Sequence, residues 1–350
     1  METVYLLTGA AGNLGSSITK SLIGAGKRVR ALVLERDPAA ALLPAQAEVV
    51  RGDLLDMASL DRFFDAAEGT RLIVIHCASL VALRPEFNQK VYDVNVTGTR
   101  NIVAKCIERH AAKLVYISST SVIPELPMGQ TIREVTRFDP DLVRGYYAKT
   151  KAEATAYVFE QGRKSGLDVS VIFPSGILGP NDYSYGLFSR FAISYANGRL
   201  PAAVRGSFNA VDVRDLAESV IACAERGGNG EGYIVANRTV SFQELLSLFQ
   251  EYCNGRRIRF FAPPWLARTG VFFVDVWGRL TGRPSSWLTA FTIYNLTRNN
   301  DYSCEKAKAE LGVTLRPFEE TIRDTVVWLR DAGKIAGAPE QARHSGAPCV

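Results

Sequence analysis

The chain has 350 residues, of which 47% are hydrophobic and 22% charged, and its formal net charge is +5. This composition is that of a globular enzyme with a sizeable core, and it excludes disorder over most of the length. The basic residues are scattered and form no long run, so we expect no nucleic-acid partner.

The six cysteines form no CxxC pair, so we expect neither a metal site nor a redox dithiol. Met1 to Thr8 lead directly into a strand, which leaves no room for a secretory signal, and no apolar stretch is long enough to span a membrane. The apolar segment 265–280 is interrupted by three charges, which favours an amphipathic helix of the fold over a membrane contact. We therefore expect a cytoplasmic protein without an integral membrane segment.

Short apolar runs alternate with amphipathic runs of helical length over the first two-thirds of the chain. The expected strands are 4–7, 29–34, 72–76, 114–118 and 169–173, with a further strand around 49–50, and the expected helices are 13–26, 59–67, 88–110 and 147–164. This alternation predicts an α/β fold, a Rossmann-like doubly wound parallel sheet, because strands buried on both faces are apolar throughout.

Three glycines follow the first strand in the pattern G-x-x-G-x-x-G. They are Gly9, Gly12 and Gly15, and Asn13 and Leu14 stand between the last two. A dinucleotide pyrophosphate needs a tight turn here, close approach of the backbone, and a helix that begins under the phosphate. The position between a strand and a helix therefore predicts a dinucleotide site.

The end of the second strand bears on the choice between NAD and NADP. A carboxylate there binds the ribose hydroxyls, whereas an arginine accepts a 2′-phosphate. Glu35 lies 20 residues after Gly15, but Arg36 is adjacent. We expect NAD and leave NADP open.

Three later segments also fit a bound cofactor. Asp53 and Leu54 follow the strand around 49–50, where an aspartate can accept from the adenine amino group. Ala78 and Ser79 are small residues after the strand 72–76, and Asn95 lies in the following helix.

Hydroxyl side chains gather where the strand 114–118 ends. Ser118, Ser119, Thr120 and Ser121 are consecutive, and one of these hydroxyls is expected to bind a reacting oxygen, because the carboxyl ends of strands line the site in such sheets.

Tyr147 and Lys151 stand four residues apart at the start of a predicted helix, and hence on one face. A tyrosine exchanges a proton during hydride transfer only if its pKa falls from about 10 towards neutrality. One ammonium at ~4 Å supplies about the required 4 kcal/mol at an effective dielectric near 20. Tyr146 is the rival, but Thr150 stands four residues after it and carries no charge.

Helical stretches dominate after residue 175, with short strands expected at 233–236 and 257–260. Ser241 opens a capping box for a helix through about Tyr252, and apolar residues at helical spacing predict a last helix around 318–329. We divide the chain into a dinucleotide-binding domain at 1–175, with later strands returning to its sheet, a smaller and mostly helical substrate-binding region at 176–335, and a flexible tail at 336–350.

These motifs resemble those of the extended short-chain dehydrogenase/reductase family, most of all its branch of 3β-hydroxysteroid dehydrogenases and dihydroflavonol reductases. The resemblance rests on residues 8–15, 52–53, 95–99, 118–119, 147 with 151, 173–180 and 211–217. It implies that Ser119 is the catalytic serine, that Tyr147 exchanges the proton, and that Lys151 lowers the pKa of that tyrosine and binds the nicotinamide ribose. It further implies that Pro174 and Ser175 pack near the nicotinamide, and that a homodimer forms through the helices 88–110 and 147–164.

The resulting prediction is an NAD(P)-dependent enzyme that interconverts a secondary alcohol and a ketone on a hydrophobic small molecule such as a steroid. The motivation is the apolar character of the second region, which holds Phe188, Phe191, Tyr195, Trp265, Phe272, Phe273, Trp277 and Trp287. At least half of these aromatic residues are expected in the core.

Two alternatives remain. A nucleotide-sugar epimerase would use the same tyrosine, but residues 174–177 lack the asparagine usual in such enzymes. A dehydratase would need an Asp-Glu pair where Thr120 and Ser121 stand. A non-catalytic dinucleotide-sensing regulator would need the glycine turn but not the tyrosine and lysine.

Overall fold

A computed structural model describes residues 2–82, 84–200, 203–253, 258–267, 269–271 and 290–336. The chain divides into two compact units. The first contains Met1–Ile177, Asn209–Arg238 and Arg298–Leu315, and the second contains Leu178–Phe208, Thr239–Thr297 and Arg316–Val350.

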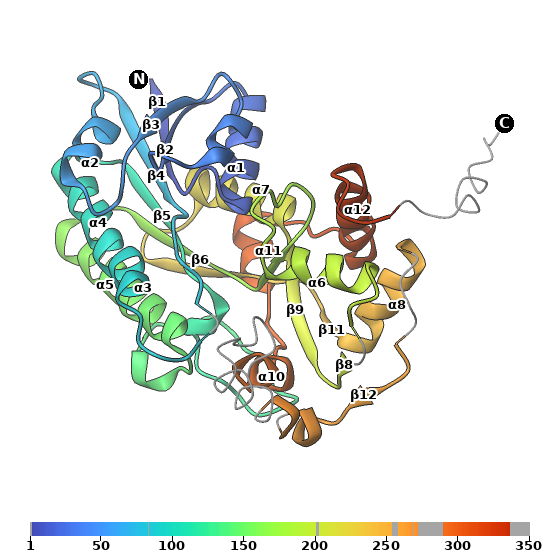
Figure 1. The fold of residues 1–350 in the computed structure, drawn as a ribbon. Coiled ribbons are helices and arrows are strands. Elements are labelled where there is room, and N and C mark those ends of the chain that lie inside the picture. Colours follow the sequence, from blue (N-terminus) through green and yellow to red (C-terminus); the bar gives the residue numbers. More distant parts are fainter. Residues whose placement is uncertain are drawn as a thin grey trace. The chain divides into compact units, whose positions relative to one another are not determined.

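The first unit is built on a seven-stranded sheet in which all strand pairs are parallel. In spatial order the strands are β10 (Glu231–Val235), β6 (Val169–Pro174), β5 (Lys113–Ile117), β4 (Arg71–His76), β1 (Thr3–Thr8), β2 (Arg28–Val33) and β3 (Glu48–Arg51). The central strands are buried along almost their whole length, as strands covered on both faces must be. The predicted Rossmann-like architecture is confirmed (Figure 1).

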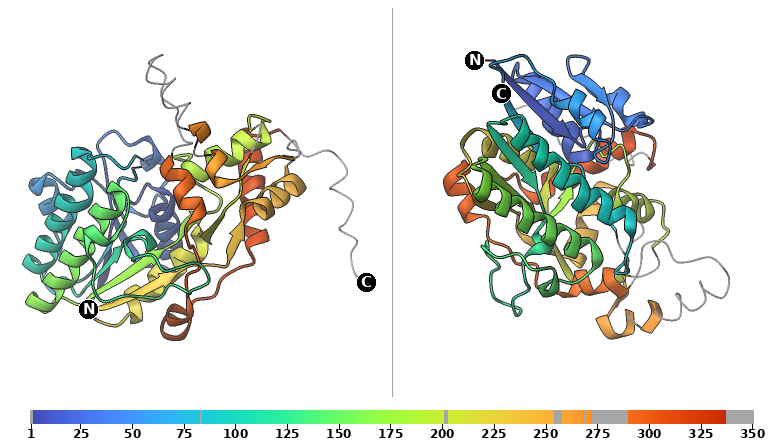
Figure 2. Two further views of the ribbon diagram at one scale, coloured as in Figure 1. Left: turned by 90° about the horizontal axis from the view of Figure 1, so that it is seen from below. Right: turned by 90° about the vertical axis from the view of Figure 1, so that its left-hand side faces the viewer.

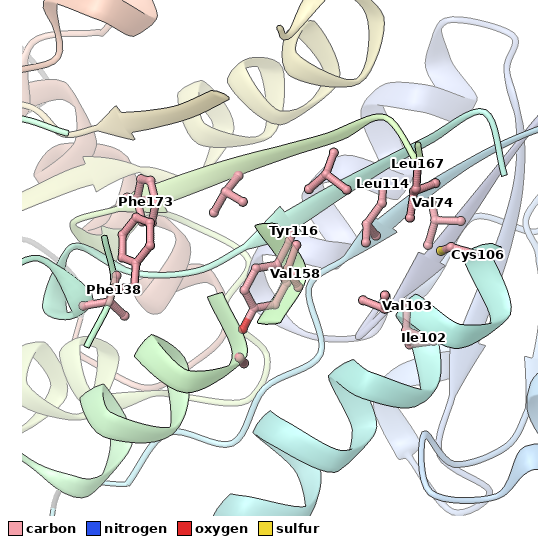
Figure 3. Packing of buried hydrophobic residues seen from close by; sticks show 14 of the residues in the cluster. Val74, Ile102, Val103, Cys106, Leu114, Tyr116, Phe138, Val158, Leu167 and Phe173 are labelled. Carbon is pink, nitrogen blue, oxygen red and sulfur yellow. The ribbon is translucent and has the colours of Figure 1, made fainter. Parts of the chain in front are cut away.

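Helices cover both faces of this sheet, and each face has its own apolar cluster. One cluster joins the sheet to α2 (Met57–Phe64), α4 (Gly98–Glu108) and α5 (Tyr146–Ser165), and Figure 3 shows part of it around Tyr116. The other joins it to α1 (Asn13–Gly24), α7 (Val213–Arg226) and α11 (Glu305–Leu311). Helices α4 and α5 lie side by side on the first face (Figure 2).

The stretch expected as one helix over 88–110 has a change of geometry inside it. Helix α3 (Gln89–Tyr92) is followed by a π-helical segment, η2 (Asp93–Thr97), before α4 begins. A π turn holds one residue more than an α turn, and such turns are frequent at functional sites. Three short 3₁₀ segments complete the unit: η1 (Pro38–Leu42), η3 (Thr120–Val122) and η4 (Pro140–Leu142).

The second unit contains α6 (Leu187–Ala196), α8 (Phe242–Tyr252), α10 (Ala290–Thr297) and α12 (Phe318–Asp331). Strands β8 (Ala203–Val204) and β12 (Phe261–Ala262) pair in parallel. Strand β11 (Thr239–Ser241) belongs to a three-stranded sheet of the order β11-β9-β7, in which most residues of β9 (Ser207–Asp212) and β7 (Gly176–Leu178) are assigned to the first unit. Residues 258–260 have no strand geometry, so the strand expected at 257–260 is wrong for them, and Arg257 lies outside the described residues.

Most of the aromatic residues that the structure describes in this unit pack against one another. Phe188 and Phe191 contact Phe249, at ring-centroid distances of 5.7 and 6.1 Å, and Tyr195 lies 5.8 Å from the same ring. Tyr195 is therefore a core residue of the unit, and Phe188 and Phe191 are half-buried beside it. Trp265 is 67% exposed, whereas Phe272, Phe273, Trp277 and Trp287 lie outside the described residues.

Among the described helices, none combines the length and apolar character needed to cross a bilayer. The predicted segment 265–280 is described only at 265–267 and 269–271, and the predicted tail only at residue 336.

Candidate active site

The strand order has a switch point at the carboxyl ends of β1 and β4. From β1 the sheet continues to β2 on one side, and from β4 it continues to β5 on the other, so the connections diverge between them. Ligands bind at such a switch point in open parallel sheets. Strand β1 ends at Thr8 and β4 at His76, in register with each other.

The glycine turn after β1 leaves no room for side chains. Gly9 has φ +68°, and a Cβ there would lie 2.8 Å from the Ala78 backbone nitrogen. A Cβ on Gly15 would lie 2.8 Å from Ala10 Cα and would also strike the Gly9 carbonyl. The Gly12 N–H donates to Gly9 O at 3.0 Å, which closes the turn directly before α1.

This turn meets the needs of a dinucleotide. Gly12 caps α1 without a side chain, so the first helical N–H groups are not satisfied by a cap. The Asn13 Oδ1 atom is buried and has no hydrogen-bond partner among the described residues. A bound pyrophosphate can accept from the first turn of the helix, and the dipole of α1 favours its charge.

A buried polar chain joins the end of β1 to α4. Thr8 Oγ1 lies 2.6 Å from His76 Nδ1, and His76 Nε2 lies 3.0 Å from Thr99 Oγ1. Thr8 Oγ1 accepts from the Ala78 N–H at 3.2 Å, and Thr99 Oγ1 donates to Asn95 O at 2.7 Å. Thr8 therefore donates to Nδ1, and the histidine carries its proton on Nε2. Burial, and then Lys151, lower the pKa of His76 to about 3, which keeps this ring neutral.

Asn95, in the π-helical segment η2, holds the loop after β4 and the start of α5. Its Oδ1 accepts from the Leu80 N–H at 2.8 Å, and its Nδ2 donates to Leu80 O and to Thr150 Oγ1, both at 3.1 Å. Thr150 in turn donates to Tyr147 O at 2.8 Å. The structure therefore directs the Asn95 amide to these protein partners, and its predicted contact with a cofactor stays a prediction.

Lys151 is 1% exposed and donates to Ile117 O at 2.7 Å. Its Nζ also lies 4.2 Å from the centre of the Tyr116 ring. Burial is the main cause that lowers the pKa of Lys151, to about 7. An ammonium with one hydrogen bond has two N–H groups left, which suits a ribose diol as the further acceptor.

Tyr147, half-buried on α5, lies near the hydroxyls of Ser79 and Ser119. Burial raises the pKa of Tyr147, and the two hydroxyls lower it by a smaller amount. Lys151 is not one of the groups that shift this pKa among the described residues, although the sequence predicts that role for it. Ser119 and Tyr147 are therefore close enough to interact, whereas their catalytic roles stay a prediction.

The hydroxyls after β5 have different hydrogen-bond partners, so they cannot all serve the site. Ser118 Oγ lies 2.7 Å from Thr155 Oγ1, inside the contact between the sheet and α5. Ser119 Oγ caps η3 by accepting from the Ser121 N–H at 3.2 Å and from Ser121 Oγ at 3.0 Å. Both bonds are accepted, so the Ser119 proton is left to donate outward.

The remaining predicted residues lie at the carboxyl ends of the neighbouring strands. Glu35 and Arg36 are exposed after β2, where Arg51 donates to the Leu34 and Glu35 carbonyls at 3.1 and 3.0 Å. Asp53 is exposed and accepts from the Leu55 N–H at 3.0 Å.

Leu54 is buried in the cluster under α4, where the Leu54 Cβ atom lies against Gly98. Pro174 ends β6, and the buried Ser175 Oγ has no partner among the described residues.

The sequence reasoning overlooked Thr8, His76 and Thr99 as a connected group. His76 was visible as the end of a strand, but no local pattern pairs it with residues 68 positions before and 23 after it. The only available signal was a histidine in an otherwise apolar run, which is more often a satisfied core residue.

Known proteins resemble this chain over most of its length. Residues 5–236 match the family model described as the NAD dependent epimerase/dehydratase family. The chain is 29% identical to sterol demethylase protein B of Methylococcus capsulatus, over 94% of this chain and 99% of that protein. It is 28% identical to a 3 beta-hydroxysteroid dehydrogenase/Delta 5-->4-isomerase of Mycobacterium tuberculosis, over 88% of this chain and 85% of that protein.

Solved structures share the fold. The crystal structure of gox2253 has a TM-score of 0.82 at 26% identity and covers 96% of this chain and 99% of that one. UDP-glucose 4-epimerase from Thermotoga maritima has a TM-score of 0.72 at 19% identity, over 94% of this chain and 99% of that one, which shows a common fold alone. With two-thirds of its length matched, the chain belongs to the NAD dependent epimerase/dehydratase family, as an NAD-dependent enzyme of the extended short-chain dehydrogenase type.

Proposed function

We propose that this enzyme interconverts a secondary alcohol and a ketone on a hydrophobic small molecule such as a steroid. The observation that supports this most is the grouping of Ser119, Tyr147 and Lys151 beside the glycine turn. Ser119 and Tyr147 interact, and Lys151 lies one helical turn after Tyr147 on α5.

The chain's own groups would hold NAD along the carboxyl ends of β1 to β6. Gly9, Gly12 and Gly15 make room for the pyrophosphate, which Asn13 and Leu14 would meet at the first turn of α1. Lys151 would donate to the nicotinamide ribose. Flanking contacts are proposed for Glu35, Arg36, Asp53, Leu54, Ala78, Ser79, Asn95, Pro174 and Ser175. When bound, NAD supplies or accepts the hydride.

Tyr147 would exchange the proton at the substrate oxygen, and Ser119 would donate a hydrogen bond to that oxygen. The raised pKa keeps the Tyr147 hydroxyl protonated at neutral pH, which is the state of the proton donor in ketone reduction. Alcohol oxidation needs the phenolate. We therefore expect reduction to dominate near neutrality and oxidation to speed up as the pH rises.

The proposed substrate class has two supports. A 3 beta-hydroxysteroid dehydrogenase and a sterol demethylase protein are similar over nearly the whole chain. The residues 174–177 also lack the asparagine that nucleotide-sugar enzymes usually carry there. We propose that the region 176–335 recognises this substrate.

We also propose a homodimer in which α4 and α5 meet their copies. Arg100 on α4 forms an ion pair with Glu153 on α5 at 3.0 Å and lies over the Tyr157 ring, so the two helices present one connected surface. Sedimentation of the full chain would show a dimer, and a monomer at micromolar concentration contradicts this arrangement.

The test is turnover of NADH or NAD with a panel of ketosteroids, hydroxysteroids and aryl ketones. Tyr147→Phe removes the exchangeable proton and keeps the ring, so we expect at least a 10²-fold loss of kcat, the size of a general acid contribution. NADH fluorescence titration serves as the control, because the variant should still bind the cofactor.

Undiminished turnover in Tyr147→Phe would defeat the proposed chemistry. Protection by UDP-sugars in a thermal shift assay, without steroid turnover, would point to an epimerase. NADH binding without turnover on any carbonyl compound would point to a dinucleotide-sensing regulator.

A further inference from the structure

The Lys151 ammonium is surrounded by uncharged groups. The titratable side chains that interact with it are His76 at the end of β4, Cys77 directly after that strand, and Tyr116 on β5. Tyr147 stands one helical turn before Lys151 on α5. Burial lowers the pKa of His76 to about 3 and raises that of Cys77 to about 12, so both are neutral at pH 7. In the described ranges no carboxylate pairs with Lys151, and the Ile117 carbonyl is its hydrogen-bond acceptor.

The other close contact of this ammonium is the ring of Tyr116 on β5. The distance of 4.2 Å from Nζ to the ring centre is well within the range of a cation–π interaction. Such interactions are strongest where water is excluded, and here Tyr116 is 0% and Lys151 1% exposed. The Tyr116 ring and the Ile117 carbonyl are therefore the described contacts that can offset the loss of water around the Lys151 charge.

The hydroxyl and the ring of Tyr116 face different neighbours. The hydroxyl is buried close to the Thr99 hydroxyl, which itself donates to Asn95 O and lies 3.0 Å from His76 Nε2. The face of the ring is the part of Tyr116 that meets the Lys151 ammonium.

We propose that Tyr116 is a positioning residue for Lys151: the face of its ring stabilises the charged form of the lysine and holds the ammonium at the carboxyl end of β5. This inference rests on the proposed function, in which the charged lysine donates to the nicotinamide ribose. Tyr116 would act through Lys151, since its own side chain is fully buried.

The test measures the charge of Lys151 directly in the full chain. Lysine labelled with ¹³C at Cε reports its own titration by NMR, and the Lys151 signal is the one lost in Lys151→Met. Tyr116→Met removes the ring but keeps an apolar side chain, and we expect the titration midpoint to fall by about one pH unit. Tyr116→Phe keeps the ring and is the matched control, with a midpoint close to that of the unaltered chain.

A second variant keeps the size and shape of the ring at position 116 and changes only its electrostatic attraction for cations. Replacement of Tyr116 by pentafluorophenylalanine gives a ring of similar size whose face no longer attracts cations, so the midpoint should again fall. In both variants that lose the attraction, the alkaline limb of the pH–rate profile should move to lower pH together with the midpoint, because activity requires the protonated lysine.

An unchanged midpoint with pentafluorophenylalanine overturns the proposal, and so does an equal fall in Tyr116→Phe, which would assign the effect to the hydroxyl. The NMR midpoint needs no turnover. If the steroid assays fail while the midpoints behave as expected, the proposed substrate is wrong and the role of Tyr116 in charging Lys151 stands.

Discussion

Lys151 and Tyr147 respond in opposite directions to the same burial. Loss of water lowers the pKa of the lysine and raises that of the tyrosine, since the charged form is disfavoured in each case. Both shifts oppose the charged pair that proton exchange requires. The site therefore carries a cost in stability that the free protein bears, as functional sites often do.

This cost gives a prediction for Lys151→Met. The pKa of Lys151 falls from 10.5 in the unfolded chain to about 7 in the folded one, so the unfolded chain binds more protons between these values. The stability of the unaltered protein should therefore rise with pH across this window, whereas the uncharged methionine side chain of the variant contributes no such dependence. Relative to the variant, we expect a gain of about 3 kcal/mol between pH 7 and pH 10.

Urea unfolding of both proteins at each pH measures this difference, and at pH 7 the variant should be the more stable of the two. Equal stability at pH 7 together with parallel pH dependence would mean that the lysine is well solvated in the folded state.

Single positions also mark where sequence reasoning succeeded and failed. The spacing of Tyr147 and Lys151 indicated one helical face, because four residues make about one turn. The same spacing could not show that Lys151 turns to Ile117 and Tyr116, since those contacts cross from α5 to β5. Charge and distance alone do not include burial, which is the main cause of the pKa shift of both residues.

The first turn of α1 packs closely against the glycine turn and tolerates no side chain at Gly15. Gly15→Ala would place its Cβ 2.8 Å from the Ala10 backbone, which cannot move without opening the glycine turn. We expect at least a ten-fold loss of NADH affinity and a loss of stability of roughly 1–3 kcal/mol.

Gly24→Ala, at the other end of α1, is the matched control. A Cβ there meets nothing within 4 Å, so NADH should bind normally, with stability unchanged or higher by roughly 0.5–1 kcal/mol. Fluorescence titration and thermal unfolding compare the two variants. Wild-type affinity in Gly15→Ala would show that no pyrophosphate approaches this turn.

The helices and strands differ in how well they can be predicted from the sequence. The strands of the sheet were predicted to within a few residues, because buried parallel strands are continuous apolar runs. The π-helical segment η2 was not, since the apolar spacing on either side of Asn95 reads as one helix. Strand β12 begins after the expected position. It pairs with β8 over two residues only, and so short a strand has no alternating pattern from which its position could be predicted.

At the scale of the whole molecule, the first unit depends on distant parts of the chain. The second apolar cluster includes Val213, Leu216 and Val220 of α7 and Leu311 of α11, and β10 forms the edge next to β6. A chain truncated after Ile177 lacks all of these. We expect it to bind the dye ANS and to lose near-UV circular dichroism, as compact states without fixed packing do.

A chain ending at residue 336 is the comparison, and it should keep the NADH affinity and melting temperature of the full chain. Cooperative thermal unfolding of the chain truncated after Ile177 would show that the sheet needs neither β10 nor the later helices.

The same interleaving governs when the enzyme can form during its synthesis. Six of the seven strands of the sheet are complete by Pro174, yet the last segment of that unit ends at Leu315. At about 5–20 residues per second, a ribosome needs roughly 7–28 s to make the intervening chain. For that time the nascent sheet lacks α7 and α11 on one apolar face and β10 at its edge, so the demand for chaperones should be set by translation speed between codons 178 and 315.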